Sequence, residues 1–503
     1  MDPILLGFKL ILEPFTMMVI VLASAFGLFM GAMPGLTAAM ATALLVPITF
    51  FMAPVPSLAG IVAACAMAIF AGDIPSILLR IPGTPASAAY TDEAYAMTKK
   101  GQAELAMGIC LVSSAIGGIA GSLALALASP ALAELAIGFG SFEYFWLAVL
   151  GLSCAAFISA DRPIKAVISL MIGLFLSVIG VDPTSGYPRF TFGTNVLAGG
   201  IEFIPVLVGM FAVSEVLRNV TDMEPQHHVA KVGIKLANIY KGLGAVLWKY
   251  RLGLARGCVV GTIIGALPGA GCDIAAWISY GTSKKLSKEP EKYGTGHPEG
   301  LVDAGASNNA ALGGTWIPAL VFGIPGDSIT AIVIGVLYLK GINPGPTVFL
   351  QRPEIMYAVF IAFILSNILM LPFGMIAIKA AKYVLNVPRE TLMPIILLFC
   401  MVGTFAMNNS VFGIVVMASM GILAYLMEEN GFPIAPAVLG LVLGPLIEDN
   451  FVTSMMKANG NPLEFFTRPG AGVLGALVMA VWFSPLILKL VRRRYKDPII
   501  PVA

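Results

Sequence analysis

The stretch from residue 301 to residue 346 combines apolar flanks with a centre that an ordinary spanning helix would not contain. The helix-breaking and small polar residues of that centre are Asn308, Asn309, Gly313, Gly314, Thr315, Gly323, Pro325, Gly326, Asp327 and Ser328. In lipid every backbone polar group needs an internal partner, so a broken helix must be buried in protein or line a wet cavity. The freed amides, carbonyls and small side chains are then available to hold a solute. The stretch therefore predicts half of a solute site within a membrane protein.

An earlier part of the chain repeats this pattern. Residues 265–269 (GALPG) repeat residues 31–35 (GAMPG), and residues 324–326 (IPG) repeat residues 81–83. The first pair is 234 residues apart (31 to 265) and the second 243 (81 to 324), a difference that the hydrophilic loop at 284–299 absorbs. Interrupted apolar segments at corresponding places predict two homologous halves with a solute site at their interface. Chance similarity is the alternative, because glycine and proline are common in membrane helices.

Composition narrows the fold class and the function classes. Hydrophobic residues make up 58% of the 503 residues and charged residues 12%, against roughly 45–50% and about 25% in soluble domains. We expect an all-α polytopic membrane protein with roughly 10–14 transmembrane or re-entrant helices, since one span needs about 20 apolar residues. The six cysteines lie singly without CxxC spacing, and the three histidines form no HExxH pattern. Neither a structural metal centre nor an enzyme is therefore expected. The sequence also lacks a basic run interleaved with aromatic residues, the pattern that would predict nucleic-acid binding.

Charge distribution predicts the domain organisation. The interval 218–256 holds seven lysine and arginine residues against two acidic ones, and residues 491–496 (VRRRYK) are also basic. By the positive-inside rule both intervals lie in the cytoplasm. We expect a first membrane half at 1–217, a basic cytoplasmic linker at 218–256 and a second membrane half at 257–503.

Hydropathy adds expectations about individual segments. Residues 105–128 and 131–159 read as separate apolar runs, and residues 447–469 as a wet segment. Residues 90–104 (YTDEAYAMTKKGQAE) read as a wet loop. The interrupted helices favour two halves that are inverted relative to each other. On this interpretation Lys99 and Lys100 would fall on the outer side of the membrane, against the positive-inside rule.

Seven segments together carry a resemblance to a known family. They are GAMPGLTAAMATALLVPITF (31–50), SILLRIPGTPASAA (76–89), GVDPTSGYPRFTFG (180–193), IEFIPVLVGMFAVSEVL (201–217), GALPGAG (265–271), NNAALGGTWIPALVFGIPG (308–326) and INPGP (342–346). In this order they resemble the large membrane subunit of the tripartite tricarboxylate transporter family, over nearly the whole chain.

The resemblance implies a multi-pass permease of the bacterial inner membrane. Its implied partners are a small membrane subunit and a periplasmic solute-binding protein, and a homo-oligomer stays open. The implied activity is secondary uptake of small tricarboxylates or dicarboxylates by sodium or proton symport, without a cofactor other than Na⁺ as a coupling ion. Consistent with this, the chain has no Walker A pattern.

The chain also departs from the pattern of that family. Asp73, Asp273 and Asp327 stand where small or polar residues are usual, and Ala304 and Gly305 stand where Pro-Glu is usual. These changes leave open a different solute, such as a zwitterionic or aromatic acid. A channel or a scaffold subunit that transports nothing itself is the alternative from another class, although a channel would not need a repeated pair of interrupted segments.

The breaks also suggest which residues bind the solute. Half-helix N-termini that follow Pro-Gly breaks offer free backbone N–H groups and the positive end of the helix dipole, which suit a carboxylate. Neighbouring hydroxyl and amide side chains add neutral donors. The candidate solute-binding residues are Pro34, Gly35, Thr37, Pro82, Gly83, Thr84, Ser87, Gly269, Asn308, Asn309, Pro325, Gly326 and Ser328.

Oxygen-bearing residues near the same breaks are candidates for the coupling ion, because ionisable groups inside a membrane are usually functional. These candidates are Asp73, Asp273, Asn308, Asn309 and Asp327, with a helix cap or a solute selector as the alternative role for each aspartate. Arg80 is the one cation near a break, and snorkelling to the interface is its alternative. Arg189 and Glu448 are expected to have structural or partner-contacting roles.

Overall fold

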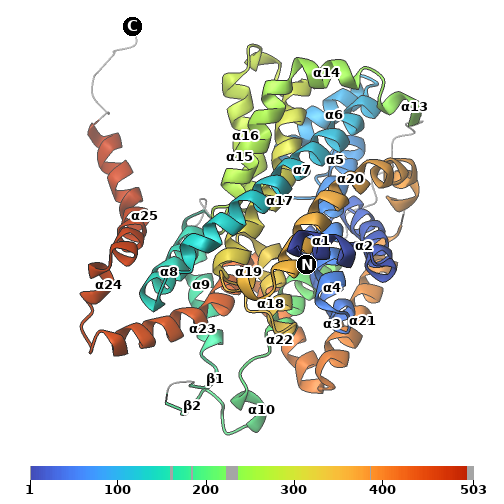
Figure 1. The fold of residues 1–503 in the computed structure, drawn as a ribbon. Helices are drawn as coiled ribbons and strands as arrows, with labels where there is room; N and C mark the ends of the chain where they lie inside the picture. The colour runs from blue at the N-terminus through green and yellow to red at the C-terminus, as the bar shows by residue number, and fades with distance from the viewer. Residues whose placement is uncertain (1, 159–162, 183–184, 222–235, 386, 495–503) are drawn as a thin grey trace.

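The computed structural model describes residues 2–158, 163–182, 185–221, 236–385 and 387–494. This part of the chain is built of helices and one very short β-hairpin (Figure 1). Eight of its helices are long and apolar enough to cross a bilayer, and five further helices of 10–17 residues are also apolar. The expectation of an all-α polytopic membrane protein is confirmed.

The elements follow one another in three groups along the chain. The first group is α1 (Pro3–Ile11), α2 (Pro14–Ala32), α3 (Ala38–Phe50), α4 (Pro54–Ala71), α5 (Asp73–Leu79), η1 (Ser87–Ala89), α6 (Thr91–Lys99) and α7 (Ala103–Ala136). The second is α8 (Ser141–Ile158), α9 (Pro163–Ser177), β1 (Gly180–Val181), β2 (Pro188–Arg189), α10 (Asn195–Ala198), α11 (Phe203–Val208), the π-helical turn η2 (Gly209–Val213) and α12 (Ser214–Thr221). The third is α13 (Leu236–Ile239), α14 (Leu243–Lys249), α15 (Arg251–Gly265), α16 (Gly271–Leu286), η3 (Pro290–Lys292), α17 (Pro298–Phe322), α18 (Ser328–Leu339), α19 (Val348–Gln351), α20 (Pro353–Val384), α21 (Arg389–Asn408), α22 (Val411–Glu429), α23 (Ile434–Lys457), α24 (Glu464–Thr467) and α25 (Pro469–Arg494).

Glycine sets the distance between α2 and α4. Gly27 and Gly31 of α2 lie against the backbone carbonyls of Ala64 and Ala68 of α4. A Cβ atom at either glycine would overlap the facing carbonyl oxygen, so only glycine lets the two backbones approach this closely. All residues of α4 and α5 except Pro54 and Leu79 are buried inside the protein.

The contact of α15 with α17 has the same construction. Gly261 and Gly265 of α15 lie against the carbonyls of Ser307 and Ala311 of α17. The glycines are each 234 residues from those of α2 (27 to 261), and their partners are each 243 residues from those of α4 (64 to 307). The sequence repeat is therefore also a repeat of packing contacts.

The two broken helices end in the same way. The Ile81 backbone N–H donates to the Pro75 carbonyl (3.4 Å), and the Ile324 N–H donates to the Pro318 carbonyl (3.2 Å). The residue before each isoleucine is left-handed, with φ of 61° and 68°. Such a left-handed residue closes a helix by satisfying one of its last carbonyls. One helix thus ends immediately before each IPG motif.

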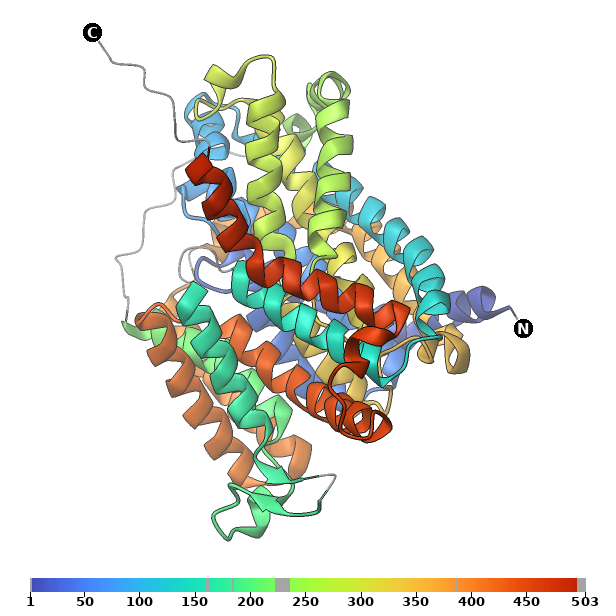
Figure 2. The same cartoon turned by 90° about the vertical axis from the view of Figure 1, so that its left-hand side faces the viewer.

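A long helix from the other repeat covers each broken helix. α7 packs along α17, where Gly117 meets the carbonyl of Ala306. α20 packs along α4, where Gly374 faces the ring of Phe70. The two repeats are therefore interlocked. On the flank that faces the viewer in Figure 2, α8, α9, α23 and α25 form a further packed group.

Two segment boundaries predicted from hydropathy are wrong. The apolar runs at 105–128 and 131–159 are not divided near residue 130, because α7 continues through Pro130 as far as Ala136. The predicted wet segment at 447–469 begins inside α23. The first boundary rested on Pro130, which can lie inside a helix without ending it. The second rested on charged side chains such as Glu448, which finds a protein partner in Arg189.

The predicted wet loop at 90–104 and the predicted linker are also more structured than expected. Residues 91–99 form α6, whose Glu93 is fully buried. In the interval 218–256, Arg218 belongs to α12 and Arg251 begins α15. Residues 222–235 lie outside the described residues. Farther along the chain, α21 ends at Asn408, and Asn409 follows in the left-handed conformation (φ 51°).

A small hairpin, formed by β1 and β2, lies beside a cavity. β1 pairs with β2 in antiparallel register, and Arg189 of β2 donates from Nη2 to Glu448 Oε2 of α23 at 3.1 Å. This cavity of about 770 Å³ lies between the hairpin, α18 and α23. Its walls are mainly aliphatic, and none of the predicted solute- or ion-binding residues lines it. The Arg189–Glu448 pair joins the hairpin to α23, and both residues also line this cavity.

Replacing Gly31 by alanine tests the contact between α2 and α4. Gly31→Ala is expected to lower stability by about 1–3 kcal/mol, since the new methyl group must push the Ala68 carbonyl away. Gly281→Ala is the matched control, because this α16 position faces open space and alanine is favoured over glycine by up to about 1 kcal/mol in a helix. Thermal unfolding of the purified proteins in detergent measures both. Equal melting temperatures would contradict the close-contact interpretation.

Candidate solute site

The chain breaks at the two IPG motifs (81–83 and 324–326), with the helices beside them, border one cavity of about 340 Å³. One wall comes from the repeated elements α3, α4, α16, α17 and α18. The opposite wall comes from η2, α12, α22 and the start of α23. The polar residues that line it are Thr37, Thr84, Ser214, Glu215, Arg218, Asp273, Asn308, Asp327, Ser328 and Glu428.

Six of the predicted residues line this cavity, namely Thr37, Thr84, Asp273, Asn308, Asp327 and Ser328. Other predicted residues shape the backbone behind it. Gly35 and Gly269 both adopt left-handed conformations, with φ of 87° and 81°. The Gly269 N–H donates to the Gly326 carbonyl (2.7 Å) and thereby ties one break of the second repeat to the other. Gly83 donates in a similar way to the Gly72 carbonyl (3.1 Å). Pro34, Pro82, Ser87 and Pro325 lie within the same breaks.

The chain's own side chains already cap most of the half-helices. Asp327 Oδ1 accepts from the backbone N–H of Thr330 at 2.8 Å, at the start of α18. Thr84 Oγ1 accepts from the Ser87 N–H at 3.2 Å at the equivalent place in the first repeat. Thr37 Oγ1 caps α3 by accepting from the Met40 N–H at 3.1 Å. These capped amides are no longer free for a solute. Side chains, rather than helix N-termini, are therefore the main groups that a solute meets here.

The two central asparagines of α17 face different surroundings. Asn308 lines the cavity, and its Nδ2 lies 3.4 Å from the Tyr90 hydroxyl. Asn309 points toward α20, where its Nδ2 contacts the Met370 sulfur at 3.6 Å. Consecutive residues on a helix differ by about 100° in direction, so only one of the pair reaches the cavity.

The wall formed by α12 and α22 is the part that sequence reasoning missed. Arg218 forms ion pairs with Glu215 one turn earlier (3.1 Å) and with Glu428 of α22. It was assigned to the cytoplasmic linker because it opens the longest hydrophilic interval of the chain. The spacing of Glu215 and Arg218 at i and i+3 was the available signal that α12 continues through this residue.

Behind the cavity lies a carboxylate that is fully buried. Asp73 stands at the junction of α4 and α5 and is 0% exposed. The Tyr90 hydroxyl donates to its Oδ1 at 2.6 Å, whereas its Oδ2 has no hydrogen-bond partner. The sequence did not indicate Tyr90, because this tyrosine opens a segment with the composition of a wet loop.

Arg80 lies away from the cavity. Its Nε donates to Asp92 Oδ1 at 2.9 Å on the surface of α6, and both side chains are more than half exposed. It therefore neither lines the cavity nor stands free to bind a solute there.

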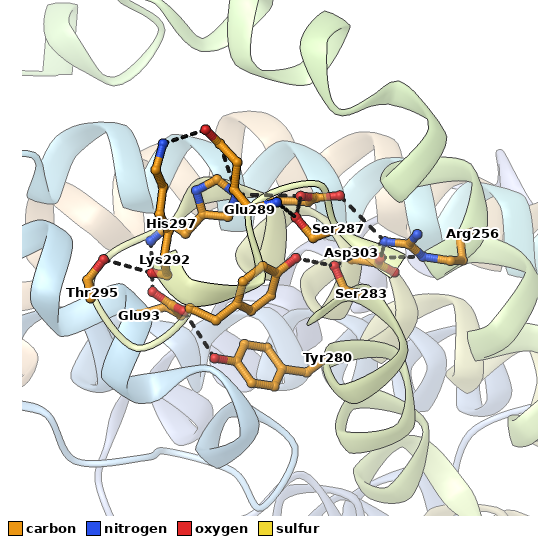
Figure 3. Close-up of polar contacts among 12 residues, drawn as sticks. Glu93, Arg256, Tyr280, Ser283, Ser287, Glu289, Lys292, Thr295, His297 and Asp303 are labelled. Atoms are coloured by element: carbon orange, nitrogen blue, oxygen red, sulfur yellow. Dashed lines mark hydrogen bonds and ion pairs between the residues drawn. The ribbon is translucent and has the colours of Figure 1, made fainter. Parts of the chain in front are cut away.

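A polar network holds α6 against the loop that joins α16 to α17 (Figure 3). The Glu93 carboxylate accepts from the Tyr280 hydroxyl (3.0 Å) and from the backbone N–H groups of Gly296 (2.6 Å), His297 (2.8 Å) and Gly294. In the same loop, burial raises the pKa of Tyr293 to about 12. Its hydroxyl therefore stays protonated and shares a hydrogen bond with Ser283 (2.8 Å).

A second part of this network joins α15 to α17. Arg256 donates from Nε to Asp303 Oδ2 at 2.7 Å, and Ser279 donates to Asp303 Oδ1 at 2.7 Å. Asp303 is fully buried, and its partners supply the donors that a buried carboxylate needs. The end of the protein that carries α14 and α16 is thus fixed by buried ionic contacts rather than by apolar packing alone.

Comparison with known proteins places the chain in a family. The tripartite tricarboxylate transporter TctA family matches residues 17–439. The chain belongs to this family. A protein of Agrobacterium vitis described as "Uncharacterized 52.8 kDa protein in TAR-I ttuC' 3'region" is 34% identical over 493 residues, which cover 98% of this chain and 97% of that protein. A shorter protein of the same organism, described as "Uncharacterized protein in TAR-II ttuC' 3'region", is 34% identical over 222 residues, 44% of this chain and 92% of its own length.

No solved structure matches the chain with significance. Family membership confirms the resemblance found in the sequence, and it identifies the chain as a multi-pass membrane permease of the tripartite tricarboxylate transporters.

Removing the Glu93 carboxylate tests the network in Figure 3. Glu93→Ala leaves three backbone amides without their acceptor, and each unsatisfied buried group costs about 1–3 kcal/mol. We expect a clear fall in thermal stability, and faster proteolysis of the 287–297 loop. Glu291→Ala, at an exposed position of that loop, is the control and should change neither. An unaltered loop in Glu93→Ala would show that the contacts do not hold it.

Proposed function

We propose that this chain is the permease subunit that carries a small carboxylate through the 340 Å³ cavity, in a tripartite transporter of the bacterial inner membrane. The observation that carries the proposal is the convergence of both breaks on one polar cavity. Its volume falls in the usual range for small-molecule sites, about 300–1,000 Å³. The hydroxyl groups of Thr37 and Ser328, the amide of Asn308 and the guanidinium of Arg218 are the donors for the solute. None of them is an unpaired cation, so the solute is not held too tightly to leave.

The remaining parts of the proposal follow the family. A periplasmic solute-binding protein delivers the solute, a small membrane subunit completes the complex, and a cation gradient drives symport. Of the five cation candidates, Asp73, Asp273, Asn308 and Asp327 are retained, because the Asn309 amide contacts the Met370 sulfur instead. Na⁺ or a proton is the coupling ion. Asp327 also caps α18, which gives it a structural role in addition to any role in transport.

We also propose that residues 1–217 and 257–503 are two inverted halves. In support, α16 reaches the top of Figure 1, whereas its counterpart α3 lies at the bottom. The Glu93 contacts hold α6 next to the α16–α17 loop. The lysines at 99–100 therefore lie at the same end as the basic residues of α14 and α16, in contrast to the expectation that inversion would place them outside. This end is the cytoplasmic one by the positive-inside rule.

A second candidate concerns the charge of the solute. Four carboxylates line the cavity, those of Glu215, Asp273, Asp327 and Glu428, against the single guanidinium of Arg218. Arg218 is already paired with Glu215 and Glu428. Such walls repel a polyanion and favour a solute that carries an ammonium group beside its carboxylate. This observation favours a zwitterionic acid over a tricarboxylate.

The two asparagines of α17 provide a matched pair of variants for the site. Asn308→Ala is expected to reduce solute uptake about tenfold or more, since it removes a donor from the cavity and about 1.4 kcal/mol corresponds to a factor of ten. Asn309→Ala, which faces Met370, is expected to retain uptake and to lose stability only. Uptake of labelled acids into liposomes that contain all three subunits measures both. Loss of uptake in Asn309→Ala alone would place the site elsewhere.

The charge of the solute is tested by comparing two solutes in one variant. Asp273→Asn removes one carboxylate from the cavity wall. The ratio of dicarboxylate uptake to zwitterion uptake should therefore rise, by about tenfold for the loss of one charge contact of ~1.4 kcal/mol. A wild-type protein that accepts only dicarboxylates would exclude the zwitterion candidate. An unchanged uptake ratio in Asp273→Asn would show that Asp273 does not select the solute.

A further inference from the structure

Asp73 occupies a setting that a charged carboxylate does not tolerate by itself. It is fully buried at the α4–α5 junction, and among the described residues no lysine, arginine or histidine pairs with it. The titratable groups that face it are the hydroxyl of Tyr90, before α6, and the thiol of Cys110, on α7. Moving an unpaired carboxylate anion out of water is costly, so such a group needs either a bound cation or a proton.

Two buried acceptor atoms in the group around Asp73 lack a hydrogen-bond donor. The Tyr90 hydroxyl donates to Asp73 Oδ1 (2.6 Å), and the Asn308 amide approaches the Tyr90 oxygen (3.4 Å). Two buried acceptors of this group, Asp73 Oδ2 and Asn308 Oδ1, have no partner. Buried polar atoms without partners are rare and normally mark a missing proton, ion or water. A proton bound at Asp73 Oδ2 neutralises the carboxyl and converts one of these unpartnered acceptors into a donor.

The same residues reach the solute cavity. Asn308 lines the cavity on one side and contacts Tyr90 on the other. A solute that draws the Asn308 amide toward itself therefore withdraws it from Tyr90, whose hydroxyl donates to Asp73 Oδ1 at 2.6 Å. The cavity and the buried carboxylate are linked through two side chains.

We propose that Asp73 is the proton-binding carboxylate of the transport cycle, and that Asn308 and Tyr90 link its protonation to solute binding. This inference rests on the proposed transport function. A proton fits the group better than Na⁺ does, because Na⁺ needs several oxygen ligands directed at one point, whereas the Tyr90 hydroxyl directs its hydrogen at Asp73 Oδ1.

Two transport assays separate the roles of proton and solute. The complex of all three subunits is reconstituted in liposomes, and solute exchange is compared with solute accumulation driven by an inward pH gradient at constant Na⁺. Asp73→Asn is expected to retain exchange, which moves no net proton, and to lose at least tenfold in accumulation together with its pH dependence. Asp92→Asn, an exposed carboxylate of α6, is the control and should match the wild type in both assays.

Two further variants keep the test independent of misfolding. Asp73→Glu restores an ionisable group and should recover gradient-driven accumulation with an altered pH profile. Tyr90→Phe removes a donor that stabilises the carboxylate anion, so its half-maximal accumulation should move to higher pH, by about one unit. A purely structural role for Tyr90 would lower the rate without moving this profile.

Three results would overturn the inference. Wild-type pH dependence in a folded Asp73→Asn protein would show that the proton binds elsewhere. Accumulation that follows a Na⁺ gradient, and loses this dependence in Asp73→Asn, would show that the site binds Na⁺ instead. Wild-type liposomes without any solute exchange would contradict the proposed transport function itself, and the inference would fall with it.

Discussion

Direct backbone contact between helices is the constraint on which this structure depends. A helix broken inside a membrane leaves amides and carbonyls that lipid cannot satisfy, at several kcal/mol for each group. Here each broken helix lies against a partner helix without intervening side chains, as at Gly31 against Ala68 and at Gly265 against Ala311. The breaks are therefore enclosed by protein, and their free groups bond to each other, as Gly269 does to Gly326. Without these glycines the helices would separate and the breaks would meet lipid.

The local chemistry of each break then determines what is left for a solute. Thr84 in one repeat and Asp327 in the other cap the following turn with the same pair of reciprocal hydrogen bonds. A threonine makes this cap without charge, whereas an aspartate adds a carboxylate to the cavity wall. The two repeats thus share a backbone and differ in electrostatics. An asymmetric solute, with unlike groups at its two ends, suits such a pair of walls.

The sequence predicted the features that reside in local backbone chemistry. Glycine and proline interrupt helices wherever they cluster, so the sequence predicted both breaks and their repetition. It also predicted six of the residues that line the cavity. The sequence did not predict contacts between distant segments. Tyr90 and Glu93 stand in a hydrophilic stretch, and only the tertiary structure shows that Asp73 and the α16–α17 loop bury them. The contact of Arg218 with Glu428 was not predicted for the same reason, since the two residues lie on helices far apart in the sequence.

The packing of α7 on the second repeat and of α20 on the first has a consequence for folding during synthesis. α4 is covered by α2 of its own repeat and by α20 of the other. During synthesis α4 enters the membrane before α20 is translated, so the face of α4 that carries Phe70 lacks its α20 partner during that interval. The first repeat therefore completes its packing only when the second repeat has been made. Ribosome pausing or chaperone contact between the two would act on this unfinished state.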